Sequence, residues 1–255
     1  MDEYGILEGT KILVFRGLIL QGTTSFQVAC EALFRLLVEK AEISPGQDIL
    51  DVGSGCGDST HLLSQLKPKS LSGVTSDHVQ AQISKRRFPS LHFVEADAVK
   101  YVTSLGNDTV DCIFALDCAY HFSYRTTFLR ESFRVLRPRG RIAMTDLALG
   151  NDTTLWQRVL LLLICYLTSS PFANFVKEDE YRKSLVNVGF VNISVDDISR
   201  DVFSGLASFI KTQEEDLTRF GIRGNWSGYR LFARILRRWD IGIVKLIVVS
   251  AERNG

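Results

Sequence analysis

Asp51-Val52-Gly53-Ser54-Gly55-Cys56-Gly57 is the stretch of this 255-residue chain that decides its fold. The apolar run 48–52 predicts a short buried strand, and Asp58 or Ser59 can cap a helix that follows. Glycines between a strand and a helix permit positive φ angles and let a ligand approach the backbone closely. The helix N-terminus adds free N–H groups that hold phosphate or carboxylate groups. We therefore expect a strand, a ligand-binding turn and a helix here.

The spacing of the glycines within the turn limits the kind of ligand that we expect it to bind. The glycines follow a Gly-x-Gly-x-Gly pattern, whereas a dinucleotide fingerprint has Gly-x-Gly-x-x-Gly. Asp51 precedes the first glycine. A carboxylate there would repel a diphosphate and attract the ammonium group of an amino acid. The turn therefore favours a ligand with an amino-acid tail.

Alternating strands and helices continue on both sides of this turn. Short apolar runs predict strands at 71–74, 91–94, 110–116, 141–144, 190–198 and 241–251. Helical spacing predicts helices at 79–87, 99–104, 125–135, 178–188, 201–219 and 229–239. Such alternation indicates an α/β fold with a parallel sheet covered on both faces.

Composition excludes several classes of protein. Thirty Lys and Arg against 29 Asp and Glu give a net charge of +1, which argues against a general nucleic-acid binder. Five Cys without a CxxC pair predict neither a disulfide framework nor a zinc cluster, so we expect no metal. Residues 1–4 are acidic, unlike a secretory leader, and the apolar run 159–167 is far shorter than the roughly 20 residues of a membrane span. We expect an intracellular, cytoplasmic protein.

Five segments in order resemble the motifs of class I S-adenosylmethionine-dependent methyltransferases. They are residues 49–57, 73–80, 95–98, 111–117 and 135–141. The segment Gly73-Val74-Thr75-Ser76-Asp77-His78-Val79-Gln80 is similar to the tocopherol, sterol and cyclopropane-fatty-acid type within that family. The resemblance implies a Rossmann-like, doubly wound, seven-stranded sheet, mostly parallel with the last strand antiparallel. It also implies an N-terminal helical lid and a cap inserted after the fifth strand.

The resemblance also divides the chain and implies its cofactor, S-adenosyl-L-methionine. We expect one domain, residues 1–255, with a helical lid at 1–45, a cofactor-binding core at 46–147 and a substrate cap at 148–177. Residues 178–255 would complete the sheet and the pocket wall.

The resemblance assigns the cofactor contacts by position. The acid and the glycine backbone would hold the methionyl part, residues 75–76 would meet ribose and adenine, and an acid with the next N–H would read the adenine edge. The implied residues are Asp51, Gly53, Ser54, Gly55, Gly57, Thr75, Ser76, Gln80, Asp97, Ala98 and Ala115. Many relatives carry an acid where Thr75 stands, so ribose binding here falls to a neighbour such as Asp77 or is weaker.

Candidates for the chemistry lie just after the fourth and fifth strands, where an open sheet places its ligand crevice. His121 titrates near neutrality and is a natural base, although packing after a strand is an alternative. Asp146 would orient that base or bind substrate, or else cap a turn. Asp117 and Tyr120 are candidate substrate contacts, with a cap and a half-buried ring as the alternatives.

The apolar stretch 153–176 predicts a lining for an apolar acceptor, although plain core packing explains the same residues. Trp156 and Leu160 would line the pocket from this stretch, and Trp226 would close it from the C-terminal side. The basic stretch 229–239 indicates either a solvated face or a peripheral membrane contact.

Together these features predict methyl transfer to a small, mostly apolar natural product or lipid-like metabolite. An oxygen or nitrogen acceptor is slightly favoured and a carbon acceptor is possible. A nicotinamide-dependent oxidoreductase and a cofactor-binding module without catalysis stay as alternatives. Binding of NAD(P)H would indicate the first, and full cofactor binding without turnover the second. The oligomeric state is left open.

Overall fold

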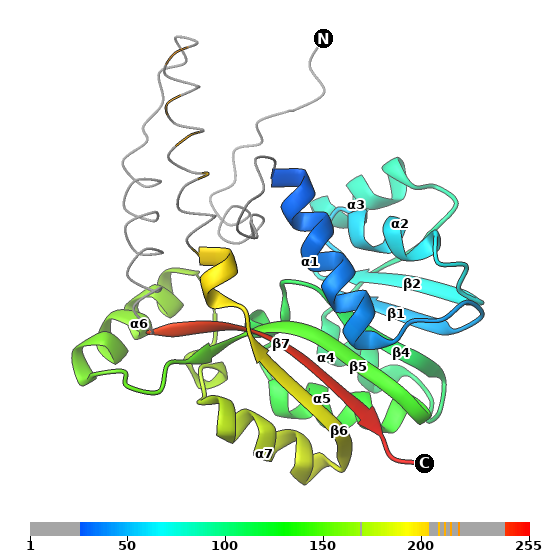
Figure 1. Ribbon diagram of the computed structural model, residues 1–255. Coiled ribbons are helices and arrows are strands. Elements are labelled where there is room, and N and C mark those ends of the chain that lie inside the picture. The colour runs from blue at the N-terminus through cyan, green and yellow to red at the C-terminus, as the bar shows by residue number, and fades with distance from the viewer. Residues whose placement is uncertain are drawn as a thin grey trace.

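A central seven-stranded sheet organises the computed structural model, which describes residues 26–168, 170–203 and 243–255 and the single positions 209, 212, 215 and 219 (Figure 1). The strand order is β3-β2-β1-β4-β5-β7-β6. The strands are β1 (Asp48–Val52), β2 (Ser70–Thr75), β3 (His92–Glu95), β4 (Val110–Ala115), β5 (Leu136–Leu149), β6 (Phe190–Asp197) and β7 (Val244–Arg253). β1 to β5 pair in parallel, and β7 is antiparallel to both neighbours, β5 and β6. The predicted sheet, including the antiparallel last strand, is confirmed.

Helices cover both faces of this sheet (Figure 1). The helices are α1 (Phe26–Ala41), α2 (Asp58–Ser64), α3 (His78–Arg87), α4 (Ala98–Ser104), α5 (Arg125–Val135), α6 (Leu155–Thr168) and α7 (Glu178–Val188), with short 3-10 turns η1 (Ala119–His121) and η2 (Phe172–Asn174). One apolar cluster joins α1, α2 and α6 to the sheet, and a second cluster joins α4, α5 and α7 to it. The strands serve both clusters because successive side chains point to opposite faces: Cys112 and Phe114 belong to one cluster, Ile113 and Ala115 to the other.

The described part of the N-terminal region is helix α1, which packs on one face of the sheet. α1 buries Leu33, Phe34 and Leu37 against the sheet, as its helical spacing predicts. Residues 1–25 of the expected lid lie outside the described residues, as do Trp226 and the stretch 229–239. The boundaries of the lid and cap stay predictions. Among the described residues, no helix is both long enough and apolar enough to cross a bilayer.

β5 is much longer than the predicted strand at 141–144. Pro138-Arg139-Gly140 looks like a turn in the sequence, but the structure accommodates it as an irregularity inside the strand. The register passes from Val110 opposite Leu136 to Cys112 opposite Arg141, so β5 carries extra residues there. Asp146, predicted just after the strand, therefore lies within it, because β5 continues to Leu149.

Candidate active site

The site lies where the strand order reverses. The chain winds from β1 outward through β2 and β3 on one side, and from β4 through β5 on the other, so β1 and β4 are neighbours at the centre (Figure 1). Open α/β sheets bind ligands outside the carboxyl ends of the strands at such a point. The glycine turn follows β1 here, and η1 follows β4.

The glycine turn has the backbone that its composition predicts. Gly53, Gly55 and Gly57 have φ angles of 75°, 57° and 92°. A Cβ atom on Gly53 would lie 2.4 Å from the Sγ atom of Cys118, so the segment after β4 packs directly on the turn. Gly57 itself is the N-cap of α2 and no side chain caps the helix, so the prediction that Asp58 or Ser59 does so is wrong.

Asp51 is held beside this turn with half of its carboxylate unsatisfied. The residue is 1% exposed, and Oδ2 accepts hydrogen bonds of 2.6 Å from the hydroxyls of Ser59 and Thr60. Oδ1 is buried without a partner, and so is Oγ of Ser54. Burial raises the pKa of Asp51 to about 6. Buried polar atoms are nearly always hydrogen-bonded, so these two atoms mark a place for a ligand donor such as an ammonium group.

Residues at the ends of β2 and β3 extend the same edge. Thr75 is buried, and its hydroxyl donates to Oε1 of Gln80 at 3.0 Å. Asp77 and Asp97 are the N-caps of α3 and α4 and accept the backbone N–H groups of Gln80 and Lys100. The predicted cofactor residues of β1, β2, β3 and β4 therefore all lie at one edge of the sheet, which suits an elongated ligand. Their individual contacts with the cofactor stay predictions.

His121 lies in η1, immediately after β4. Its Nδ1 atom is 3.1 Å from the hydroxyl of Ser170, and the ring packs beside that of Tyr120 with centroids 4.4 Å apart. The residue keeps an exposed edge. Partial burial in the surrounding protein lowers its pKa below the ordinary value of 6.5, so the imidazole is neutral at physiological pH.

A polar network fixes the backbone that carries His121. Asp117 has a φ angle of 57°, and its N–H donates to the Thr145 hydroxyl at 2.6 Å. The buried Tyr120 hydroxyl donates to Oδ1 of Asp117 at 2.9 Å, and the Asn174 amide donates to the carbonyl of Tyr120 at 3.0 Å. Asp117 and Tyr120 are thus brought together, and their bonds shape the loop. Substrate contact by either residue stays a prediction.

Comparisons with known proteins agree with this geometry. Residues 50–144 match the family model of a methyltransferase domain. This part of the chain is a methyltransferase domain, and solved methyltransferases share its fold. S-adenosyl-L-methionine is its cofactor, and the unpaired atoms of Asp51 and Ser54 suit the ammonium of that molecule. The nicotinamide alternative finds no support in this match.

The chain covers a different share of the length of each relative that it matches. It is 29% identical over 254 residues to the erythromycin 3''-O-methyltransferase of Saccharopolyspora erythraea, covering 92% of this chain and 81% of the relative. It is 29% identical over 135 residues to an O-methyltransferase of Pyrenophora dematioidea, covering 51% of this chain and only 50% of that relative. The cyclopropane synthase MmaA2 of Mycobacterium tuberculosis shares the fold, with a TM-score of 0.74 at 15% identity over 92% of this chain and 89% of that one.

Asp146 of the methyltransferase is an interior ion-pair partner. It is 0% exposed, and Oδ2 accepts from Nη1 of Arg125 at 2.9 Å and from the Tyr181 hydroxyl at 2.8 Å. Oδ1 accepts the Leu147 N–H at 2.7 Å. Burial raises the pKa of Asp146, and Arg125 opposes this shift. A fully enclosed carboxylate with both oxygens bonded is poorly placed to receive a proton from an acceptor, so this geometry favours a structural role.

α6, the helix of the expected cap, is unusually apolar on its outer side. It buries Leu161 and Cys165 against the body. Its exposed large apolar residues are Leu155, Trp156, Val159, Leu160, Leu162, Leu163, Tyr166 and Leu167. Trp156 and Leu160 are 83% and 42% exposed, and their contact with an acceptor stays a prediction. The hydropathy of the sequence indicates that such a stretch is stabilised by burial of its apolar side chains, but it does not indicate what buries them.

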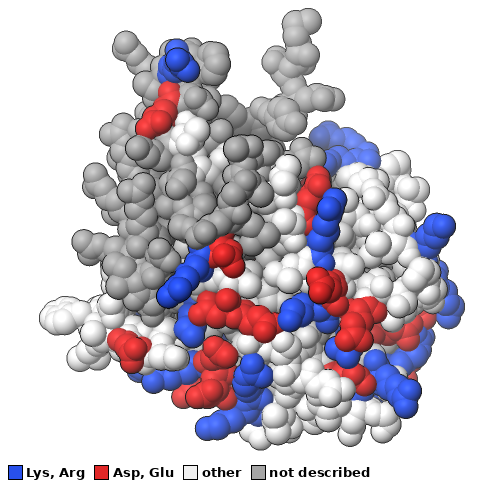
Figure 2. Space-filling view, viewed as in Figure 1, with Lys and Arg blue, Asp and Glu red and all other residues white. Residues whose placement is uncertain are grey.

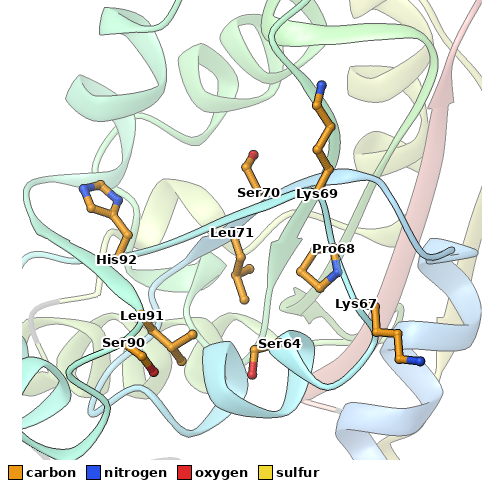
Figure 3. A pocket seen from close by; sticks show the side chains of 9 residues that line it. All are labelled: Ser64, Lys67, Pro68, Lys69, Ser70, Leu71, Ser90, Leu91 and His92. Atoms are coloured by element: carbon orange, nitrogen blue, oxygen red, sulfur yellow. The ribbon is translucent and has the colours of Figure 1, made fainter.

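A cavity of about 320 Å³ lies away from this edge, at the amino ends of β2 and β3 (Figure 3). It is lined by Ser64, Lys67, Pro68, Lys69, Ser70, Leu71, Ser90, Leu91 and His92. Lys67 and Lys69 extend in different directions there, and Lys69 and Ser70 both donate to Asp48 (Figure 3). Its polar groups therefore do not converge on a ligand. On the described part of the face in Figure 2, acidic and basic side chains are interspersed.

The sequence did not reveal the residues that form hydrogen bonds with the site residues. Thr60 binds Asp51, Thr145 binds the backbone of Asp117, and Ser170 and Asn174 bind the η1 segment. Serine, threonine and asparagine at the ends of helices and strands normally indicate caps and turns. Nothing local to positions 145, 170 or 174 marks a contact with η1.

Proposed function

We propose that this methyltransferase transfers the methyl group to a hydroxyl oxygen of a small, largely apolar acceptor, with His121 as the general base. The observation that carries the proposal is the state of His121: a neutral imidazole beside the crevice, with one nitrogen engaged by Ser170. A neutral imidazole can accept the proton of a hydroxyl group.

The division of labour follows from the site. When bound, S-adenosylmethionine would supply an electrophilic methyl group attached to its sulfonium sulfur, and that sulfur would keep the electron pair of the broken carbon–sulfur bond and become a neutral thioether. Asp51 and Ser54 offer acceptors for its ammonium, and the glycine turn lets the ligand approach the backbone. His121 takes the hydroxyl proton as the new carbon–oxygen bond forms. Alignment of the two reactants supplies much of the remaining rate enhancement.

Two findings support an oxygen acceptor of apolar character. Both relatives described above are named as O-methyltransferases. The end of α6 lies beside His121, because Ser170 follows that helix, and α6 exposes many large apolar side chains. An apolar wall with a few polar groups suits a polyketide-like or lipid-like molecule that carries a hydroxyl.

The direct test is incubation of the enzyme with methyl-labelled cofactor and a panel of hydroxylated apolar metabolites. Mass spectrometry would detect the labelled product, and carbon–proton correlation spectra would identify the methylated atom. A methoxy product supports the proposal, whereas label on carbon or nitrogen contradicts it. Titration calorimetry with cofactor is the control that separates an inactive preparation from a wrong acceptor class.

A further inference from the structure

A chain of hydroxyl groups connects the last turn of α6 to His121. The Thr168 hydroxyl donates to the carbonyl of Ile164 at 2.9 Å, the oxygens of Thr168 and Ser170 lie 3.1 Å apart, and Oγ of Ser170 lies 3.1 Å from Nδ1 of His121. Ser170 is 8% exposed, and its own N–H is bound to the carbonyl of Cys165. The Ser170 hydroxyl therefore sits between two fixed partners.

The Thr168 hydroxyl has one proton and three acceptors within reach: the carbonyls of Ile164 at 2.9 Å and Cys165 at 3.5 Å, and Oγ of Ser170 at 3.1 Å. We assign the proton to the shortest of these bonds, the one to Ile164, because the carbonyl oxygen can only accept whereas Ser170 can also donate. The Thr168 oxygen is then the acceptor for the Ser170 proton. With that proton committed, Ser170 presents a lone pair to His121, and Nδ1 of the imidazole must carry hydrogen to complete the bond.

We propose that Ser170, oriented by Thr168, is a positioning residue that holds His121 as the Nδ1–H tautomer and leaves Nε2 as its proton acceptor. The hydrogen bond made by one imidazole nitrogen determines the state of the other. A hydroxyl partner also leaves the ring without the adjacent negative charge that would favour imidazolium. The catalytic consequence rests on the proposed function, whereas the tautomer itself does not.

The tautomer is measured directly on the full chain by ¹⁵N NMR with labelled histidine. His121→Gln assigns the signal among the four histidines of the sequence. We expect a protonated Nδ1 and an unprotonated Nε2 in the wild-type protein. Thr168→Val removes the acceptor of the Ser170 proton, so Ser170 turns to donate to Nδ1 and the signal shifts to the Nε2–H form. Ser170→Ala gives a mixture of tautomers.

Conservative variants keep the test decisive. Ser170→Thr and Thr168→Ser retain the hydroxyls and restore the wild-type spectrum. Thr103→Val is a matched control, because that hydroxyl also donates to a carbonyl four residues earlier, at 2.8 Å, but on α4. An Nε2–H tautomer in the wild-type protein, or unchanged spectra in both Thr168→Val and Ser170→Ala, overturns the inference.

Kinetics separate this inference from the proposed function. General bases contribute roughly 10²–10⁴-fold, so loss of the correct tautomer in Ser170→Ala should lower kcat about tenfold, with cofactor affinity unchanged. If the spectra behave as expected and His121→Gln keeps wild-type kcat, the base assignment fails while the tautomer assignment stands. If His121→Gln lowers kcat and the spectra do not change between variants, the base stands and the role of Ser170 fails.

Discussion

Replacing Asp51 by Asn tests how the buried carboxylate serves the cofactor. Its pKa of about 6 means that the cofactor-free protein holds a proton there at low pH. An ammonium ligand requires the ionised form, so the proton must leave on binding. The affinity for S-adenosylhomocysteine should therefore fall about tenfold for each pH unit below about 6 and level off above it.

The size of the effect at neutral pH follows from the unpaired Oδ1 atom. A hydrogen bond between charged groups contributes about 1.5–3 kcal/mol, so Asp51→Asn should weaken cofactor binding roughly 10- to 150-fold and remove the pH dependence. Stability should change in the opposite direction. The carboxyl pKa is raised from 3.8 to about 6 in the folded chain, so its contribution to stability is present below pH 3.8 and lost as pH rises through about 6. That shift corresponds to about 3 kcal/mol, which Asn would largely recover at pH 7.

Titration calorimetry between pH 5 and 8, with thermal unfolding of the cofactor-free protein, measures both quantities. Asp48→Asn is the matched control on the same strand. The pKa of Asp48 is lowered, chiefly by the hydrogen bond from Ser70, so its replacement should lose stability and leave cofactor affinity unchanged. A wild-type affinity that is flat from pH 5 to 8, together with full affinity in Asp51→Asn, would refute the reasoning.

Three further changes test separate parts of the site. His121→Ala should lower kcat by roughly 10²–10⁴-fold with an unchanged cofactor dissociation constant, and wild-type kcat should rise with pH through a value below 6.5; equal losses in both constants would argue against a base. Gly53→Ala should lower the free energy of unfolding by about 1–3 kcal/mol in a denaturant titration, because the new Cβ meets Cys118 at positive φ; an unchanged midpoint contradicts this. Asp146→Asn should cost about 3–5 kcal/mol of stability by leaving Arg125 buried and unpaired, while folded enzyme keeps its kcat; a stable but inactive variant would restore the catalytic assignment.

The sequence predicts the elements of this fold well where local patterns decide them. The Gly-rich turn, the alternation of short strands with helices and the boundaries of α5 and α7 all follow from periodicity and from the residue types of the turns. The doubly wound topology and the antiparallel last strand came from family resemblance, because pairing between distant strands leaves no local pattern. β5 shows the limit: Pro138-Arg139-Gly140 does bend the chain, with Arg139 at a φ angle of 66°, yet pairing with β4 and β7 resumes at Arg141, so the bend is an irregularity within one strand.

The candidate site divides in the same way. Asp51 is recognisable because the turn beside it is local, and His121 because it follows a strand end. Asp146 is equally visible as a residue, but its partners Arg125 and Tyr181 lie 21 and 35 positions away, so its burial is a tertiary fact. The apolar run in α6 is evident in the sequence, yet its exposure depends on what surrounds it.

The two titrating groups of the site are governed by the same physical effect with opposite signs. Burial without a counter-ion raises the pKa of Asp51 and lowers that of His121, so each prefers its neutral form until a ligand arrives. In the proposed reaction, the ammonium of the cofactor would stabilise the charge on Asp51, and the proton of the acceptor would create the charge on His121. Both steps fail as pH falls, so turnover at limiting cofactor should decline more steeply on the acid side than one group allows. Cofactor binding without turnover contains only the Asp51 titration, and kcat at saturation contains only that of His121. Measuring both on the same preparation therefore assigns the decline of cofactor affinity at low pH to Asp51 and the decline of kcat at low pH to His121. If the pH dependence of kcat shifts in Asp51→Asn, the titrations of the two groups are coupled.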